Sequence, residues 1–186
     1  MRIVLLAMLP AVPAHASAQS VEVFAASGTL QLWDDEGNLG AGVPIGGGVG
    51  VRWPHGWGIE LLADTQKARR EFDSDVRFDS TATGARARII RYFGTGRIQP
   101  YAGGSLGVMR VETTRESPSG CSLVNNVFAC TGRDVFRSDS TDAAWGGFAG
   151  VRIPAGNVMF VRPEFEISRA GQYTRLGGLV AIGASW

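Results

Sequence analysis

Eight stretches of the chain alternate between apolar and polar residues with a period of two, which is the pattern of β-strands with two different faces. Val, Ile, Thr, aromatic residues and Gly are enriched in them, and helix caps and three-to-four-residue apolar spacing are largely missing. The pattern predicts an all-β chain whose strands lie at 21–33, 41–53, 57–69, 77–93, 98–114, 142–154, 158–170 and 173–186.

The connections between these strands alternate in length. Tight turns follow the second, fourth and sixth strands, at 54–56, 94–97 and 155–157. Longer polar stretches follow the first, third and fifth, at 34–40, 71–76 and 115–141, whereas the seventh connection near 171–172 is short. An up-and-down meander places tight turns at one end and long loops at the other, as in membrane-spanning barrels. The sequence therefore predicts an eight-stranded antiparallel up-and-down transmembrane β-barrel.

Most strands carry apolar residues on one face and charged residues on the other, with only the first strand ambiguous. A soluble ligand-binding barrel would turn the apolar faces inward, whereas a membrane barrel would turn them toward lipid. Aromatic residues gather at strand ends, as in the girdles of membrane barrels. We expect Trp33 and Tyr173 in an outer girdle, and a periplasmic one formed by Trp53, Trp57, Phe93, Tyr101 and Trp186. This distribution favours the membrane barrel.

The same alternation predicts a charged interior. By strand parity it holds Arg52, Glu60, Asp64, Arg86, Arg88, Arg110, Glu112, Arg152, Arg162, Glu164, Glu166 and Arg175. These residues would form either a paired network that plugs the barrel or an anion-preferring pore or proton path. Eight strands enclose a space only wide enough for side chains, and unpaired buried charges are costly. The plug is therefore favoured, although a network can rearrange.

The first 18 residues have the features of an export signal, with Arg2 before an apolar centre and small residues at the end. Cleavage is expected after Ala16 or Ala18, which leaves one barrel domain at 19–186. Without Arg2 the chain has 17 basic and 17 acidic residues, and this balance argues against nucleic-acid binding.

Cys121 and Cys130 are the only cysteines, and in an exported protein an even number favours a disulfide. This bond would hold a small ring within the polar stretch 115–141, which either binds a partner or folds back onto the barrel rim. His55 is the only histidine outside the signal and lies in a turn between Trp53 and Trp57. We therefore expect no catalytic residue, cofactor or metal site.

Several motifs resemble those of the small outer-membrane β-barrel proteins of Gram-negative bacteria, a group that includes OmpA-like transmembrane domains. They are QPYAGGSLGV at 99–108, PIGGGVGVRW at 44–53, IEL at 59–61 and a terminal Trp186 preceded by apolar residues at alternate positions. The resemblance implies an outer-membrane location, with membrane lipid, lipopolysaccharide and the barrel-assembly machinery as partners.

The function expected on this basis is non-enzymatic: a structural or surface-interaction role through the outer loops, notably 115–141. A narrow porin-like channel for small ions remains an alternative. A soluble barrel that binds a ligand is a further one.

Overall fold

The computed structural model describes residues 19–35, 37–71, 76–94, 96–124 and 127–186, and the side chains within these ranges except those of 123–129. The expected signal segment and its cleavage site lie outside the described residues.

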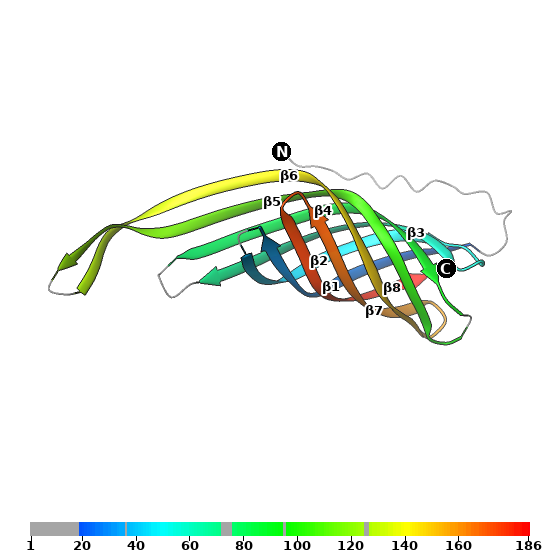
Figure 1. Ribbon diagram of the computed structural model, residues 1–186. Coiled ribbons are helices and arrows are strands. Elements are labelled where there is room, and N and C mark those ends of the chain that lie inside the picture. Colours follow the sequence, from blue (N-terminus) through cyan, green and yellow to red (C-terminus); the bar gives the residue numbers. More distant parts are fainter. Residues whose placement is uncertain (1–18, 36, 72–75, 95, 125–126) are drawn as a thin grey trace, which may run out of the picture.

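Eight antiparallel strands form a closed barrel in which each strand pairs with its neighbours in the chain (Figure 1). They are β1 (Ser20–Asp34), β2 (Gly37–Arg52), β3 (Trp57–Glu71), β4 (Arg77–Tyr92), β5 (Gln99–Val124), β6 (Val127–Ala155), β7 (Met159–Ala170) and β8 (Tyr173–Ser185). The predicted fold class is confirmed. In the part of the chain that the structure describes, no helix is long and apolar enough to cross a membrane.

The final strand closes the barrel against the first. The register between β1 and β8 runs from Glu22↔Ser185 to Trp33↔Thr174. Beyond it, the Val21 N–H donates to the Trp186 carbonyl at 2.9 Å, and the Trp186 N–H donates to the Val21 carbonyl at 3.1 Å. In lipid each unsatisfied amide costs several kcal/mol, so this closure leaves no open edge between β1 and β8.

The outer surface of the barrel is apolar and the interior is charged. Outward side chains include Ile45 and Leu106, each 68% exposed, together with a wide band that includes Val43, Val49, Ile59, Leu61, Ile89, Val108, Phe165, Ile167, Val180 and Ile182. On β1, whose facing the sequence leaves open, Glu22 and Phe24 point inward and Val23 points outward. The apolar band matches the lipid-facing surface of a membrane barrel.

Glycines let neighbouring strands approach closely in this narrow barrel. A Cβ placed on Gly107 would lie 2.1 Å from the Ala85 carbonyl oxygen on β4. A Cβ on Gly42 would lie 2.0 Å from the Lys67 carbonyl oxygen on β3. Glycine is therefore needed at these positions because the neighbouring backbone leaves no room for a side chain, as is common where two strands approach closely.

Strands β5 and β6 extend together far beyond the other strands (Figure 1). Their pairing continues from Gln99↔Arg152 to Val124↔Val127. The predicted strand ends at 114 and 142 are therefore wrong, because β5 continues to Val124 and β6 begins at Val127, so that the stretch 115–141 forms a two-stranded hairpin. Outside a membrane both faces of such a ribbon meet water, so the backbone ladder continues where the alternation of apolar residues stops. The stretch 34–40 also belongs mainly to β1 and β2.

Candidate functional site

Two arginines and two acidic residues form a closed quartet in the outer half of the interior. Arg175 on β8 donates to Asp64 on β3, with Nη1 2.6 Å from Oδ1 and Nη2 3.1 Å from Oδ2. Arg86 on β4 donates from Nη2 to Asp64 Oδ2 at 2.5 Å. Both arginines also bond to Glu166 on β7. Since all four side chains are at most 8% exposed, their charges are balanced by each other rather than by water.

A second layer of charges lies next to this quartet. Arg162 on β7 bonds to both carboxylate oxygens of Glu60 on β3. Arg88 on β4 donates to Glu164 Oε2 at 2.5 Å and lies 3.4 Å from Glu60 Oε2. The Tyr101 hydroxyl also donates to Glu164 Oε2, at 2.8 Å. Two positive and two negative charges again cancel within the layer.

The third layer lies at the end of the barrel where β1 begins and β8 ends. Glu22 on β1 is 3.0 Å from Arg152 Nη2 and 3.7 Å from Arg52 Nε. Arg52 Nη1 also donates to Gln99 Oε1 at 2.7 Å. The guanidinium of Arg152 lies 4.5 Å from the centre of the Phe160 ring. Glu22 was missed by the sequence analysis, since β1 has apolar residues on both faces.

An apolar layer fills the interior beyond the quartet, toward the hairpin. It consists of buried residues from all eight strands, with Phe78 packed against them: Leu32, Leu39, Ala68, Ala82, Met109, Val111, Ala144, Ala170 and Tyr173. Charged groups and water are both disfavoured in such a layer. It therefore closes the outer end of the charged interior.

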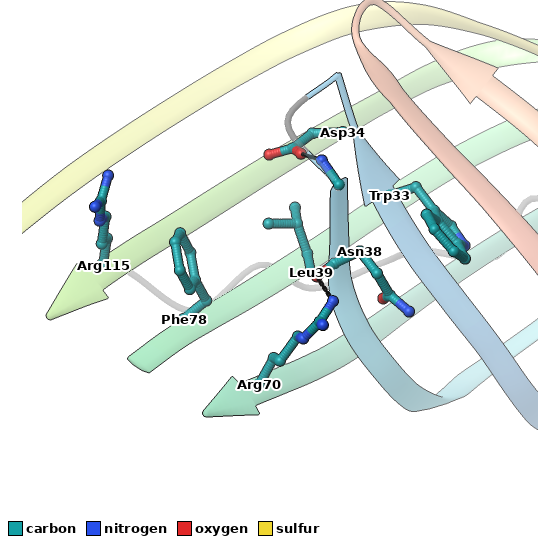
Figure 2. A pocket seen from close by; sticks show the side chains of 8 residues that line it. Trp33, Asp34, Asn38, Leu39, Arg70, Phe78 and Arg115 are labelled. Carbon is teal, nitrogen blue, oxygen red and sulfur yellow. Dashed lines mark hydrogen bonds between the residues drawn. The ribbon is translucent and has the colours of Figure 1, made fainter. Parts of the chain in front are cut away.

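The free space within the barrel is small. A cavity of about 10 Å³ lies between Phe24, Leu62 and the second charged layer, which is space for roughly one water molecule. Larger hollows lie at the two ends of the barrel. One of about 530 Å³ lies at the outer mouth beside Trp33, Phe78 and Arg115 (Figure 2). Another of about 480 Å³ lies at the opposite end, beside Arg52 and Trp186.

Two predicted interior residues lie elsewhere. Arg110 and Glu112 on β5 point outward, where their side chains are 55% and 56% exposed and pair with each other at 3.0 Å. Met109 and Val111 turn inward instead, into the apolar layer. The interior changes from charged to apolar toward the outer end, so the charged residues of β5 lie on its water-facing side there. The other ten predicted interior residues face inward, with Arg52 part-exposed at the rim.

The aromatic residues divide between the outside and the interior. Trp33, Trp57, Phe93 and Trp186 are exposed at strand ends, and Trp53 is partly exposed. Tyr101 and Tyr173, predicted for the girdles, point inward and are 2% and 4% exposed. The Tyr101 hydroxyl donates a hydrogen bond to Glu164, and Tyr173 packs in the apolar layer. Both side chains therefore belong to the interior of the barrel and not to the girdles. Trp145 on β6 is 61% exposed, although it was not among the predicted girdle residues.

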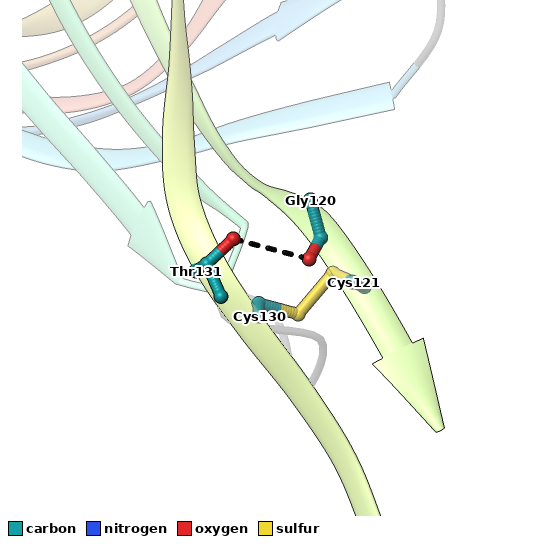
Figure 3. Close-up of a disulfide and its surroundings, with 4 residues drawn as sticks. All are labelled: Gly120, Cys121, Cys130 and Thr131. Atoms are coloured by element: carbon teal, nitrogen blue, oxygen red, sulfur yellow. Dashed lines mark hydrogen bonds between the residues drawn. A yellow bond between two sulfur atoms is a disulfide. The ribbon is translucent and has the colours of Figure 1, made fainter. Parts of the chain in front are cut away.

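The hairpin at residues 115–141 carries the predicted disulfide between Cys121 and Cys130. Figure 3 shows this bond beside a hydrogen bond from Thr131 Oγ1 to the Gly120 carbonyl, at 3.3 Å. Gly120 has a φ of 62°, and a Cβ there would lie 2.6 Å from Thr131 Oγ1. The side chains of Leu123, Val124, Val127 and Phe128, in the ring that the disulfide closes, lie outside the described side chains.

No group of three or more His, Cys, Asp or Glu residues is arranged to hold a metal ion among the described residues. His55 lies exposed in the turn between β2 and β3, where its carbonyl accepts a hydrogen bond from Arg91.

At the outer rim, hydrogen bonds from Arg77 hold the pKa of Glu71 below its usual value.

The apolar exterior, charged interior and closed ring of strands define this protein as a small transmembrane β-barrel. The model of the outer membrane protein β-barrel domain matches residues 4–181, and the chain therefore belongs to this family of Gram-negative outer-membrane proteins. No curated protein gives a significant match to the chain.

Solved structures with the same fold cover nearly the whole chain. Neisserial surface protein A has 16% identity and a TM-score of 0.57, over 91% of this chain and 96% of that one. Ail of Yersinia pestis, solved with the heparin analogue sucrose octasulfate, has 13% identity and a TM-score of 0.56, over 90% and 98%. The N-terminal barrel of Pseudomonas aeruginosa OprF has 16% identity and a TM-score of 0.50, over 90% and 97%. At these identities the likeness shows the fold.

Proposed function

We propose that this protein is a non-enzymatic outer-membrane barrel that acts at the cell surface through the hairpin at residues 115–141. The observation that carries the proposal is the contrast between the two halves of the molecule. The interior of the barrel is filled with paired charges and closed by an apolar layer. The hairpin projects beyond every other strand (Figure 1).

The packing of the interior argues for an anchor rather than a channel. An ion that crosses the barrel would have to pass the apolar layer and then separate two charge-balanced layers. Removing one partner of a buried ion pair costs about 3–5 kcal/mol. Between the hollows at the two ends, the described interior is occupied by these paired charges and the apolar layer, and the cavity beside the second charged layer holds about 10 Å³.

The hairpin has the construction of a contact surface. Val135 and Phe136 are 52% and 66% exposed, in a segment beyond the outward-facing Trp145 that marks the outer membrane boundary. The disulfide between Cys121 and Cys130 limits the conformations of its tip. Large exposed apolar side chains in a water-facing element often mark a site of interaction.

The barrel surface supports anchoring in an asymmetric membrane. Lys67, Arg69, Arg110 and Arg169 are exposed on the outer face of the barrel just beyond the apolar band. We infer that they lie near the phosphate groups of lipopolysaccharide, to which arginine and lysine bind. We also infer that the barrel-assembly machinery recognises β8 and the exposed Trp186 that follows it.

The proposal is tested by shortening the hairpin. Glu116 and Val135 lie opposite each other, so residues 117–134 can be replaced by Asn-Gly, the preferred two-residue turn. Cells that display equal amounts of either protein are compared for adhesion to matrix proteins, to heparin and to cells of the same strain. The full-length protein is expected to adhere to at least one surface and the shortened protein to none. Equal adhesion by both on every surface would contradict the proposal.

Heparin is the least favoured of these surfaces. It enters the comparison because Ail was solved with a heparin analogue. The hairpin carries three arginines balanced by three acidic residues, namely Arg115, Arg133, Arg137, Glu116, Asp134 and Asp139. A polyanion finds no positive excess there, so the hairpin favours partners of mixed charge.

A further inference from the structure

Strand β6 has a long open edge outside the barrel. Pairing with β7 begins at Ala144, and in the described part of the chain β6 residues before it have a strand partner only on the β5 side. Such an edge presents unpaired N–H and C=O groups that can pair with another strand. Proteins protect edges with charged side chains, especially lysine, and with proline. Lysine and proline do not occur between Thr131 and Thr141, and the charged residues there are two arginines and two aspartates, which can pair with each other.

The register of the hairpin shows which residues turn their backbone groups to this edge. Consecutive residues of a strand point these groups in opposite directions. The Phe93 N–H donates to the Pro100 carbonyl at 2.8 Å, so the backbone groups of Pro100 point toward β4. The even-numbered residues of β5 therefore direct their backbone N–H and C=O groups toward β4, and the odd-numbered residues direct theirs toward β6. The β5–β6 register is unbroken from Gln99↔Arg152 to Ser119↔Gly132, and it pairs odd-numbered residues of β5 with even-numbered residues of β6. The even-numbered residues of β6 therefore turn their backbone groups to β5, and the odd-numbered residues turn theirs to the open edge.

This parity limits how the edge can pair with a copy of itself. In an antiparallel pair, opposite residues either both exchange hydrogen bonds or both do not. When two identical β6 strands pair, the residues that lie opposite each other must therefore both be odd-numbered or both be even-numbered. The two-fold axis of such a pair passes at the level of a residue that lies opposite its own copy, and not between two residues. A centre at Val135 would oppose Arg133 and Arg137, and a centre at Arg137 would oppose that arginine to itself. A centre at Phe136 opposes Arg133 to Asp139 twice.

We propose that the open edge of β6 pairs antiparallel with the same edge of a second copy of this chain, centred on Phe136. The proposal rests on the surface role of the hairpin and names its partner. Charge complementarity selects this register, because opposite charges that face each other across strands are stabilising and like charges are not. Arg133 and Asp139 are 56% and 69% exposed and hold their own partners, Glu116 and Arg110, only at 3.4 and 3.5 Å.

The direction of the strands places the two copies in facing membranes. Strand β6 runs from the tip of the hairpin toward the barrel (Figure 1). Two copies in one membrane would therefore have β6 strands that run in the same direction, whereas antiparallel pairing needs opposite directions. Phe136 is eight residues from Ala144, which is about 26 Å of strand. The two barrel rims would then lie about 50 Å apart, and the contact would join one cell surface to another.

The charge pairs give a test by complementation between variants. Phosphatidylcholine vesicles that hold the refolded protein are followed by light scattering, and wild-type vesicles are expected to cluster. Arg133→Asp vesicles alone, and Asp139→Arg vesicles alone, should cluster about tenfold more slowly because like charges face each other twice. A mixture of the two variants restores both opposite-charge pairs and should cluster again. Arg97→Asp, at the opposite end of the barrel, is the matched control and should cluster like the wild type.

The register itself is tested by cysteine cross-linking. Phe136 occupies a pair without hydrogen bonds, in which the Cα atoms lie about 4.5 Å apart, so Phe136→Cys should form a disulfide dimer under oxidation. Two Ser138→Cys side chains would lie about 13 Å apart, too far for a disulfide. Val135→Pro removes an N–H from the open edge and none from the hairpin, and should abolish clustering.

The outcomes separate this inference from the proposed function. Failure of wild-type vesicles to cluster, failure of the mixture to recover, or equal cross-linking at 136 and 138 would each overturn self-pairing. The proposed function would still stand if the shortened hairpin lost adhesion to a matrix protein. If wild-type vesicles do not cluster and the shortened hairpin also leaves adhesion unchanged, the proposed surface role of the hairpin is contradicted as well.

Discussion

Replacing Asp64 by Asn is the sharpest perturbation of the charged interior. Asp64 accepts three hydrogen bonds, at 2.5, 2.6 and 3.1 Å, from Arg86 and Arg175. The substitution leaves two buried arginines facing one carboxylate, Glu166. Removing one partner of a buried ion pair costs about 3–5 kcal/mol. Because the amide oxygen still accepts a hydrogen bond, we expect a loss near the lower limit, about 3 kcal/mol in the free energy of unfolding.

The loss is measured by urea unfolding of the barrel in phosphatidylcholine vesicles, followed by tryptophan fluorescence. With an unchanged dependence on urea, the destabilisation appears as a lower unfolding midpoint. Asp139→Asn is the control, because this side chain is 69% exposed and its partner lies 3.5 Å away. Such a surface change stays within about 0.5 kcal/mol.

A double-mutant cycle shows whether charge balance is the cause. When Arg175 is first replaced by Met, one arginine, Arg86, faces the two carboxylates of Asp64 and Glu166. Asp64→Asn then restores the balance, and its cost should fall by at least 1 kcal/mol, roughly the lower range of coupling for contacting residues. An Asp64→Asn loss below about 1 kcal/mol, or one equal to that of Asp139→Asn, would refute the reasoning.

Two further predictions follow from the backbone and the disulfide. Gly107→Ala should prevent refolding to the heat-modifiable barrel, since its Cβ would lie 2.1 Å from the Ala85 carbonyl oxygen. Gly104→Ala should refold normally on gels, because the nearest atom to its Cβ lies at 3.7 Å. Replacing Cys121 and Cys130 by Ser should speed proteolysis of the hairpin, with a local loss of about 2–3 kcal/mol. The barrel should keep its unfolding midpoint in urea, and loss of the whole barrel would contradict a hairpin that is independent of it.

The fold was predictable because a membrane barrel imposes one rule along its whole length. Lipid-facing and interior residues must alternate on each strand, and the alternation located all eight strands. The same signal failed for the hairpin at 115–141, which stands in water on both faces. Nothing in hydrophobicity distinguishes a water-exposed ribbon such as Arg133–Asp139 from an irregular polar loop.

The interior was predictable where the strands pass through its charged part. Parity located Asp64, Arg86 and their partners, since only paired charges fit inside eight strands. It failed for Arg110 because the interior becomes apolar toward the outer end, and parity alone does not show where that change occurs. Tyr101 was assigned to a girdle by its position at a strand end, although the alternation of β5 turns its odd-numbered side chains inward, where Tyr101 donates a hydrogen bond to Glu164.

The register of the open edge required the structure. The sequence shows that charges surround Phe136, but not which edge of β6 is unpaired or which residues turn toward it. Those facts come from the pairing of β5 with β4 and of β6 with β7, which no local pattern encodes.

The closed interior is tested most directly by single-channel conductance of the refolded protein in a planar lipid bilayer. The account predicts no steady current, because two balanced layers of ion pairs and an apolar layer fill the barrel. A reproducible current that changes with Arg86→Ala or Glu60→Ala would contradict it, and would make the interior the functional site.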